Sequence, residues 1–124
     1  MKPLRILMLE DSNIDAEIIR RVLLKEFPEI ETRICMTKEA YLEALFDYQP
    51  DVILADNSLP QFDAIEALNI VNHHMLQVPF ILVTGTVSEE FAVNIIKRGA
   101  DDYILKDRLG RLPTSIDVAL KQRK

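Results

Sequence analysis

Short, almost wholly apolar runs alternate with longer segments of helical periodicity along this chain. Residues 4–9 are nearly all apolar, and residues 52–55 and 80–83 are entirely so. These runs are too short for helices and rich in Val, Ile and Leu, which favours buried strands. Two more strands are expected at residues 31–36, where partial alternation is typical of a sheet edge, and at residues 102–105.

The segments between these strands repeat apolar residues at the spacing of a helix. In the first segment, Ile14, Ile18 and Val22 stand four residues apart. With Leu23 and Phe27 beside them, these side chains are expected to form the buried face of a helix over residues 14–27. Four further helices are expected over residues 38–48, 62–75, 89–98 and 113–124. Thr37 and Ser88 are placed to cap two of them.

Five repeats of a strand followed by a helix predict an α/β fold. Continuously apolar strands imply a parallel sheet that is covered by helices on both faces, which is the doubly wound (βα)5 arrangement. Right-handed crossovers place the carboxyl ends of all five strands at one edge, where ligands bind in such folds. We expect a single domain over residues 1–124, because this length suits one hydrophobic core.

Polar side chains that could perform chemistry follow four of the predicted strands. They are Glu10, Asp11, Asp56, Thr84 and Lys106. Because the strand ends meet at one edge, these residues are expected to converge in one crevice. Three neighbouring carboxylates repel one another, and a divalent cation together with Lys106 would relieve that repulsion. Oxygen-only ligands favour Mg²⁺, and the set suits phosphoryl transfer onto Asp56.

Composition and charge narrow the function further. The net charge of −5 argues against direct nucleic-acid binding. The single Cys35 excludes an internal disulfide and a cysteine-based metal site, and it is expected to pack within its strand. Residues 4–9 are too short for a signal peptide or a membrane span, so we expect a cytoplasmic location without membrane association.

Each candidate residue also has a simpler explanation when it is taken alone. Asp56 could cap a helix or close a turn, and Lys106 could be a solvated surface residue. His73 and His74 are neighbours on a predicted helix and would point in different directions, which makes them poor chelators. The strand-end residues indicate a functional site because they occur together, in order, at one edge of a sheet.

These residues, in this order, resemble the receiver domain of two-component response regulators over essentially the whole chain. The motifs that carry the resemblance are Glu10-Asp11, Asp56-Asn57-Ser58-Leu59-Pro60 with Asp63, Thr84, and the stretch from Gly99 to Lys106. The resemblance implies a flavodoxin-like sheet with strand order 2-1-3-4-5. It also implies that a sensor histidine kinase or a histidine phosphotransfer protein donates a phosphoryl group from phosphohistidine to Asp56.

The resemblance also assigns roles to the other residues of the predicted site. Asp11, Asp56 and the backbone carbonyl of Ser58 would bind Mg²⁺, and Glu10 would act through water. Lys106 would pair with Asp56 before transfer and contact a phosphoryl oxygen afterwards. The Thr84 hydroxyl would take another phosphoryl oxygen.

A conformational switch is implied as well. Tyr103 is similar to an aromatic residue that changes rotamer when Thr84 moves. The expected output is a downstream protein partner on the face formed by residues 89–98, 102–105 and 113–124. The protein would catalyse its own phosphorylation and dephosphorylation without turning over an external substrate, so it is not expected to be an enzyme.

Two positions depart from the family pattern, and two other functions stay open. Asp107 stands where the family usually has proline, often after a cis bond, which costs about 2.5–4 kcal/mol for a non-proline residue. Ala64 replaces a common glycine after Asp63. The main alternative is a receiver-like interaction module that works without phosphorylation. An aspartyl-phosphate phosphatase is disfavoured, because Ser58 stands where those enzymes have a second aspartate.

Overall fold

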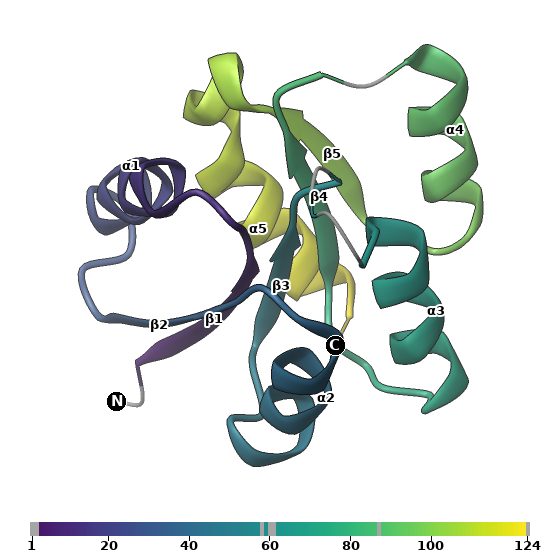
Figure 1. The fold of residues 1–124 in the computed structure, drawn as a ribbon. Coiled ribbons are helices and arrows are strands. Elements are labelled where there is room, and N and C mark those ends of the chain that lie inside the picture. Colours follow the sequence, from purple (N-terminus) through teal and green to yellow (C-terminus); the bar gives the residue numbers. More distant parts are fainter. Residues whose placement is uncertain (1–2, 58, 60–61, 87, 124) are drawn as a thin grey trace.

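A computed structural model describes residues 3–57, 59, 62–86 and 88–123, within which five strands form one parallel sheet. The strands are β1 (Leu4–Leu9), β2 (Ile30–Cys35), β3 (Val52–Ala55), β4 (Phe80–Thr84) and β5 (Asp102–Leu105). Their order in the sheet is β2-β1-β3-β4-β5. The predicted α/β fold and the strand order 2-1-3-4-5 are therefore confirmed (Figure 1).

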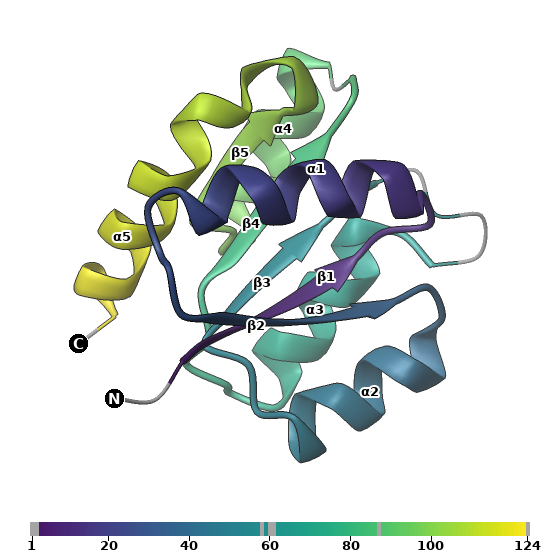
Figure 2. The same cartoon turned by 90° about the vertical axis from the view of Figure 1, so that its left-hand side faces the viewer.

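Five α-helices cover the two faces of this sheet. They are α1 (Asn13–Leu24), α2 (Lys38–Asp47), α3 (Ala64–His73), α4 (Glu89–Lys97) and α5 (Leu112–Gln122). Helices α1 and α5 lie on one face, and α2, α3 and α4 lie on the other (Figures 1 and 2). The observed bounds differ from the predicted ones by no more than about three residues, as helix ends commonly do.

The strands alternate between two cores, one on each face of the sheet. Leu7 of β1 and Ile53 of β3 pack with α2, α3 and α4, whereas Ile6 and Met8 pack with α1 and α5. This period of two is the ordinary geometry of a strand, and burial on both faces explains why the strands are apolar throughout. Cys35 is buried in β2, as predicted.

The predicted buried face of α1 is wrong for Ile14 and Ile18, whereas Leu23 is buried and Phe27 packs against the core as predicted. Ile14 is 75% exposed and Ile18 is 46% exposed, while the helix buries Ala16, Ile19 and Leu23. Both sets of residues have helical spacing, so periodicity alone did not distinguish them. The set that contains the small Ala16 faces the sheet, and Ile14 and Ile18 lie on the outer surface of the helix.

Both departures from the family pattern are accommodated locally. The described residues contain no cis peptide bond, and the chain after β5 turns directly into a 3-10 helix, η1 (Lys106–Arg111). At the other position, the Asp63 side chain accepts a hydrogen bond from the Glu66 backbone N–H and so caps α3. Ala64 follows this cap as a fully buried first residue of the helix.

Among the residues that the structure describes, no helix is both long enough and apolar enough to cross a membrane.

Candidate functional site

Four strands deliver polar residues to the carboxyl edge of the sheet. Leu9 of β1 pairs with Ala55 of β3, so the residues that follow the two strands begin at the same level. The Asp56 backbone N–H donates to the Leu9 carbonyl at 2.9 Å and holds this alignment beyond the ladder. Thr84, the last residue of β4, pairs with Leu105, which precedes Lys106. The parallel register thus produces the predicted convergence.

Asp56 is a buried carboxylate whose two oxygens both accept hydrogen bonds. The side chain is 3% exposed. The Thr84 hydroxyl donates to Oδ1 at 2.8 Å, and the Lys106 ammonium donates to Oδ2 at 2.8 Å. A buried charge without partners is strongly unfavourable, so these donors compensate for the burial of the Asp56 carboxylate. The predicted ion pair between Lys106 and Asp56 is present.

Lys106 contacts three carboxylates with one ammonium group. Its Nζ lies 2.8 Å from Glu10 Oε1, 2.7 Å from Asp15 Oδ2 and 2.8 Å from Asp56 Oδ2. Burial alone would lower the pKa of Lys106, but the hydrogen bonds to Asp15, Asp56 and Glu10 outweigh it and raise the pKa above its ordinary value. The ammonium therefore stays charged at physiological pH.

Glu10 is buried and has both oxygens engaged. Oε1 accepts from Lys106, and Oε2 accepts from the Ser12 backbone N–H at 3.1 Å. Burial raises the pKa of Glu10, although the hydrogen bonds from Lys106 and Ser12 work against that rise. Lys106 and Ser12 thus satisfy the buried carboxylate of Glu10.

Three carboxylates form a cluster that could hold a metal ion. One oxygen each from Glu10, Asp11 and Asp56 lies within 4.8 Å of the others. Asp11 is exposed, unlike the other two, and so gives the cluster a side open to solvent. Oxygen donors of this kind suit a hard divalent cation such as Mg²⁺. The third direct ligand predicted for Mg²⁺, the backbone carbonyl of Ser58, lies outside the described residues.

Thr84 and Tyr103 occupy neighbouring strands, and their side chains lie in different environments. Thr84 is 1% exposed and already donates to Asp56, whereas Tyr103 is 36% exposed on β5. The threonine hydroxyl therefore reaches Asp56 while the tyrosine ring is still at the surface. The coupled movement of Thr84 and Tyr103 stays a prediction.

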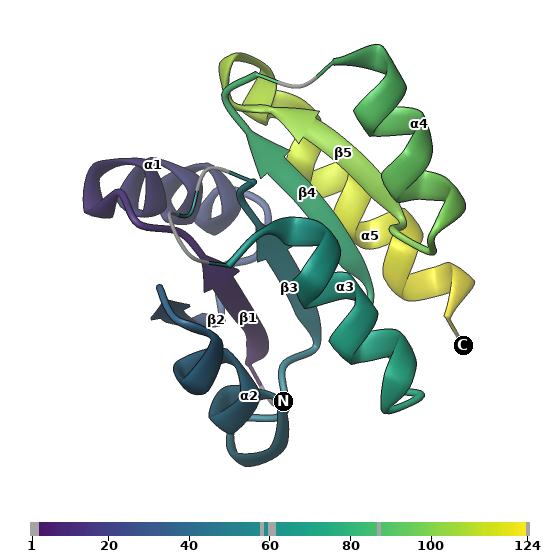
Figure 3. The ribbon, with the colours of Figure 1, turned by 45° about the vertical axis from the view of Figure 1, so that its right-hand side comes forward.

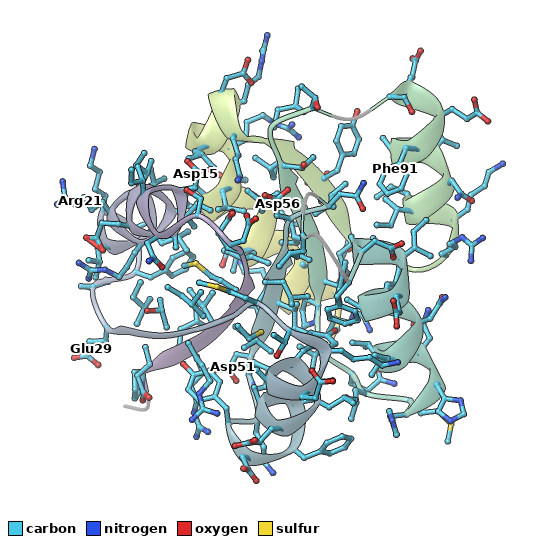
Figure 4. All side chains as sticks on the ribbon, in the orientation of Figure 1. Asp15, Arg21, Glu29, Asp51, Asp56 and Phe91 are labelled. Atoms are coloured by element: carbon cyan, nitrogen blue, oxygen red, sulfur yellow. The ribbon has the colours of Figure 1, made fainter. Side chains whose placement is uncertain are left out.

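Asp15 is the one member of the site that the sequence pattern missed. It lies in the first turn of α1, and Figure 4 shows its side chain on the same side of the molecule as Asp56. The positive end of a helix favours an acidic residue in the first turn, so an aspartate there does not by itself indicate a functional site. Its position about one helical turn after Glu10-Asp11 could have identified it from the sequence as a member of the site.

The fold and the site together define a class of protein. A flavodoxin-like sheet carries a buried, lysine-paired aspartate after its central strand, with an acidic pair after the neighbouring strand. The sequence model of the response regulator receiver domain family matches residues 6–117, and the chain belongs to this family.

Named relatives agree with this assignment. Regulatory protein AtoC of Escherichia coli (strain K12) is 34% identical over 104 residues, which cover 82% of this chain and 22% of that protein. The cell cycle transcriptional regulator CtrA of Caulobacter vibrioides is 28% identical over 103 residues, which cover 83% of this chain and 44% of that protein. The chain thus spans less than half the length of either relative.

Solved structures of receiver domains have the same fold. A signal receiver domain from Vibrio parahaemolyticus superposes with a TM-score of 0.87 at 27% identity, covering 99% of this chain and 93% of that one. A CheY-like receiver domain protein from Methanospirillum hungatei JF-1 gives a TM-score of 0.83 at 27% identity, covering 98% and 97% of the two chains. The protein is a receiver domain of the two-component response regulators.

Proposed function

We propose that Asp56 accepts a phosphoryl group from the phosphohistidine of a sensor histidine kinase or a histidine phosphotransfer protein. One observation carries the proposal: Asp56 is buried, yet it is held by a hydroxyl and an ammonium inside a cluster of further carboxylates. A turn or cap residue would need none of these partners. A phosphoryl acceptor needs all of them, because such transfer depends on positioning and charge neutralisation.

In the proposed step, an Asp56 oxygen bonds to phosphorus as the bond from phosphorus to the histidine nitrogen breaks. The nitrogen keeps the electron pair and takes a proton from solvent. Lys106 and Thr84, which now donate to Asp56, are placed to donate to phosphoryl oxygens instead. Asp11, Asp56 and the Ser58 carbonyl would hold Mg²⁺, which neutralises charge on the phosphoryl oxygens. Hydrolysis of the acyl phosphate would return the domain to its starting state.

A small acyl-phosphate donor tests this function without the unknown kinase. Incubation with acetyl phosphate and Mg²⁺ should add one phosphoryl group per chain, as measured by intact-mass spectrometry. The added group should disappear when a chelator is present throughout the reaction. A chain that gains no phosphoryl group from acetyl phosphate or from a phosphohistidine protein would instead be an interaction module that works without phosphorylation.

The outer surface of α1 supports docking of a protein donor. Ile14 and Ile18 expose apolar side chains beside Asp15, which contacts Lys106. A donor histidine must approach Asp56 at this edge, so the donor protein would bury the two isoleucines. We expect Ile14→Asp to slow transfer from a phosphohistidine protein by about tenfold, the usual effect of losing one well-packed interface residue.

Acetyl phosphate provides the internal comparison for this variant. Because acetyl phosphate needs no docking surface, its reaction with Ile14→Asp should keep the wild-type rate. Val93→Asp changes a similarly exposed apolar residue on α4 and serves as the matched control, with wild-type rates expected from both donors. Equal transfer from the phosphohistidine protein to wild type and Ile14→Asp would remove α1 from the docking surface.

The output surface that we propose consists of α4, β5 and α5. Strand β5 is the last strand of the sheet, and α4 and α5 flank it on opposite faces (Figure 3). Exposed apolar residues occur on all three elements: Val93, Ile96, Tyr103 and Val118. A surface of this kind suits a downstream protein partner.

Thr84→Ala tests the connection between the site and this surface. The variant should still be labelled on Asp56, because Asp56 and Lys106 are retained. One charge-assisted hydrogen bond is worth about 1.5–3 kcal/mol. Loss of the bond from Thr84 to the phosphoryl group should therefore shift the equilibrium between the unphosphorylated and phosphorylated conformations by roughly tenfold or more. Amide chemical shifts of residues 88–106, with and without a beryllium fluoride mimic, report the response.

Thr32→Ala is the control, since it removes a strand threonine from β2, at the opposite edge of the sheet. It should respond to the mimic as the wild type does. If the mimic changed the amide chemical shifts of Thr84→Ala as much as those of wild type, Thr84 would not transmit the signal.

A further inference from the structure

Asp15 joins two parts of the chain that are far apart in sequence. Its Oδ2 accepts a hydrogen bond from Lys106 Nζ at 2.7 Å across 91 positions. An ordinary surface pair in this protein is different: Asp117 and Lys121 lie one helical turn apart with side chains 51% and 72% exposed. The Lys106 side chain is only 18% exposed and that of Asp15 is 37% exposed. The pair is therefore part of the site rather than an incidental surface contact.

The start of α1 fixes the position of Asp15. The Ser12 side chain caps α1 and accepts a hydrogen bond from the Asp15 backbone N–H at 3.1 Å. The Ser12 backbone N–H donates to Glu10 Oε2, and Glu10 Oε1 contacts Lys106. Three hydrogen bonds and the ion pair between Lys106 and Glu10 thus form a closed ring through Glu10, Ser12, Asp15 and Lys106. Asp15 also lies where the helix dipole favours a carboxylate.

The Lys106 ammonium donates hydrogen bonds to Asp15 and Asp56 and forms a third ion pair with Glu10. Glu10 and Asp56 also belong to the cluster that would gather around a metal ion, whereas Asp15 stands outside that cluster in the part of the chain that the structure describes. A cation in the cluster would compete with the ammonium for Glu10 and Asp56 and would repel it. Asp15 offers a contact for which the cation does not compete.

We propose that Asp15 is a positioning residue that keeps the Lys106 ammonium beside Asp56 while a cation occupies the acidic cluster. The inference rests on the proposed function, since the ammonium is held there for the incoming phosphoryl group. Without Asp15, the long lysine side chain is free to swing away from the cation toward solvent. Because Asp15 is already paired with Lys106, its own repulsion of the phosphoryl group is largely compensated. Loss of positioning therefore outweighs relief of repulsion.

The rate of labelling by acetyl phosphate provides the first test. Asp15→Ala should lower the rate at saturating Mg²⁺ by about tenfold, the effect of losing one hydrogen bond between charged groups. Asp15→Asn keeps the shape and one acceptor and should lie between Asp15→Ala and wild type. The Mg²⁺ concentration that gives half the maximal rate should stay unchanged, because Asp15 is not a ligand. Glu39→Ala, which removes an exposed acid from the first turn of α2, should behave as wild type.

The lysine ammonium provides a second test that does not depend on phosphorylation. In wild type, NMR should detect a slowly exchanging Lys106 ammonium signal that persists when Mg²⁺ is added. In Asp15→Ala that signal should be lost on addition of Mg²⁺. A persistent signal together with a wild-type labelling rate would overturn the proposal, as would a large rise in the half-saturating Mg²⁺ concentration.

The two tests also separate this proposal from the proposed function. If wild type accepts no phosphoryl group, the proposed function is wrong, and the ammonium signal alone decides whether Asp15 holds Lys106. If wild type and Asp15→Ala are labelled equally fast, the proposed function is supported and the proposed role of Asp15 is wrong.

Discussion

Asp56→Asn should abolish phosphorylation by acetyl phosphate and by any phosphohistidine donor. The amide that replaces the carboxylate has no anionic oxygen with which to attack phosphorus, so the effect is a complete loss rather than a slower rate. The fold should survive, because Lys106 keeps its contacts with Glu10 and Asp15, and Asn keeps an acceptor for Thr84. Intact-mass spectrometry after incubation with donor and Mg²⁺ measures the result.

Asp63→Asn is the matched control for this experiment. It changes a nearby aspartate in the same way, and asparagine caps a helix as well as aspartate does, so α3 should be unaffected. This control should be labelled as fully as wild type. Equal labelling of wild type and Asp56→Asn would show that another residue accepts the phosphoryl group and would refute the assignment of Asp56.

Asp11→Ala should weaken Mg²⁺ binding more than Glu10→Ala does. Asp11 is exposed at the open side of the cluster, and we assign it as a direct ligand, whereas Glu10 is assigned an indirect role through water. Loss of an indirect contact typically costs about 10–100-fold in metal affinity, so the loss of a direct ligand should exceed roughly 100-fold. The chain has no tryptophan to report binding, so isothermal titration calorimetry is the suitable measurement.

The same variant should behave in the opposite way without metal. Removing one carboxylate from the cluster reduces repulsion, so Asp11→Ala should have a higher Tm than wild type in metal-free buffer. Asp47→Ala, at an exposed acidic position at the end of α2, should change neither the Tm nor the Mg²⁺ affinity substantially. Equal Mg²⁺ affinity in wild type and Asp11→Ala would remove Asp11 from the ligand set.

The strand-end residues could be predicted from sequence because a parallel sheet leaves them little freedom. An apolar run identifies each strand, and right-handed crossovers bring the carboxyl ends to one edge. The convergence of Glu10, Asp56 and Lys106 follows from that topology without any knowledge of side-chain packing. The observed ion pairs of Lys106 with Glu10 and Asp56 agree with it.

What the sequence did not reveal depends on how α1 is rotated about its own axis. The helix has two apolar stripes with acceptable spacing, and only packing against the sheet selects the stripe that contains Ala16. That rotation leaves Ile14 exposed and turns Asp15 toward Lys106. One undetermined angle therefore accounts both for the wrong placement of Ile14 and Ile18 and for the missed Asp15.

The short turn η1 makes Lys106 the first residue of the connection between β5 and α5. Helix α5 is also fastened to the start of β5, where the Ser115 hydroxyl donates to Asp102 at 2.7 Å and Arg123 donates to Asp101. Local opening of η1 and α5 would withdraw the ammonium and leave the carboxylates of the site facing one another uncompensated. That repulsion adds to the free energy of opening, so α5 should be among the slowest segments to exchange its amide hydrogens. A metal ion bound to the carboxylates would replace the charge of Lys106, and exchange in α5 should then become faster.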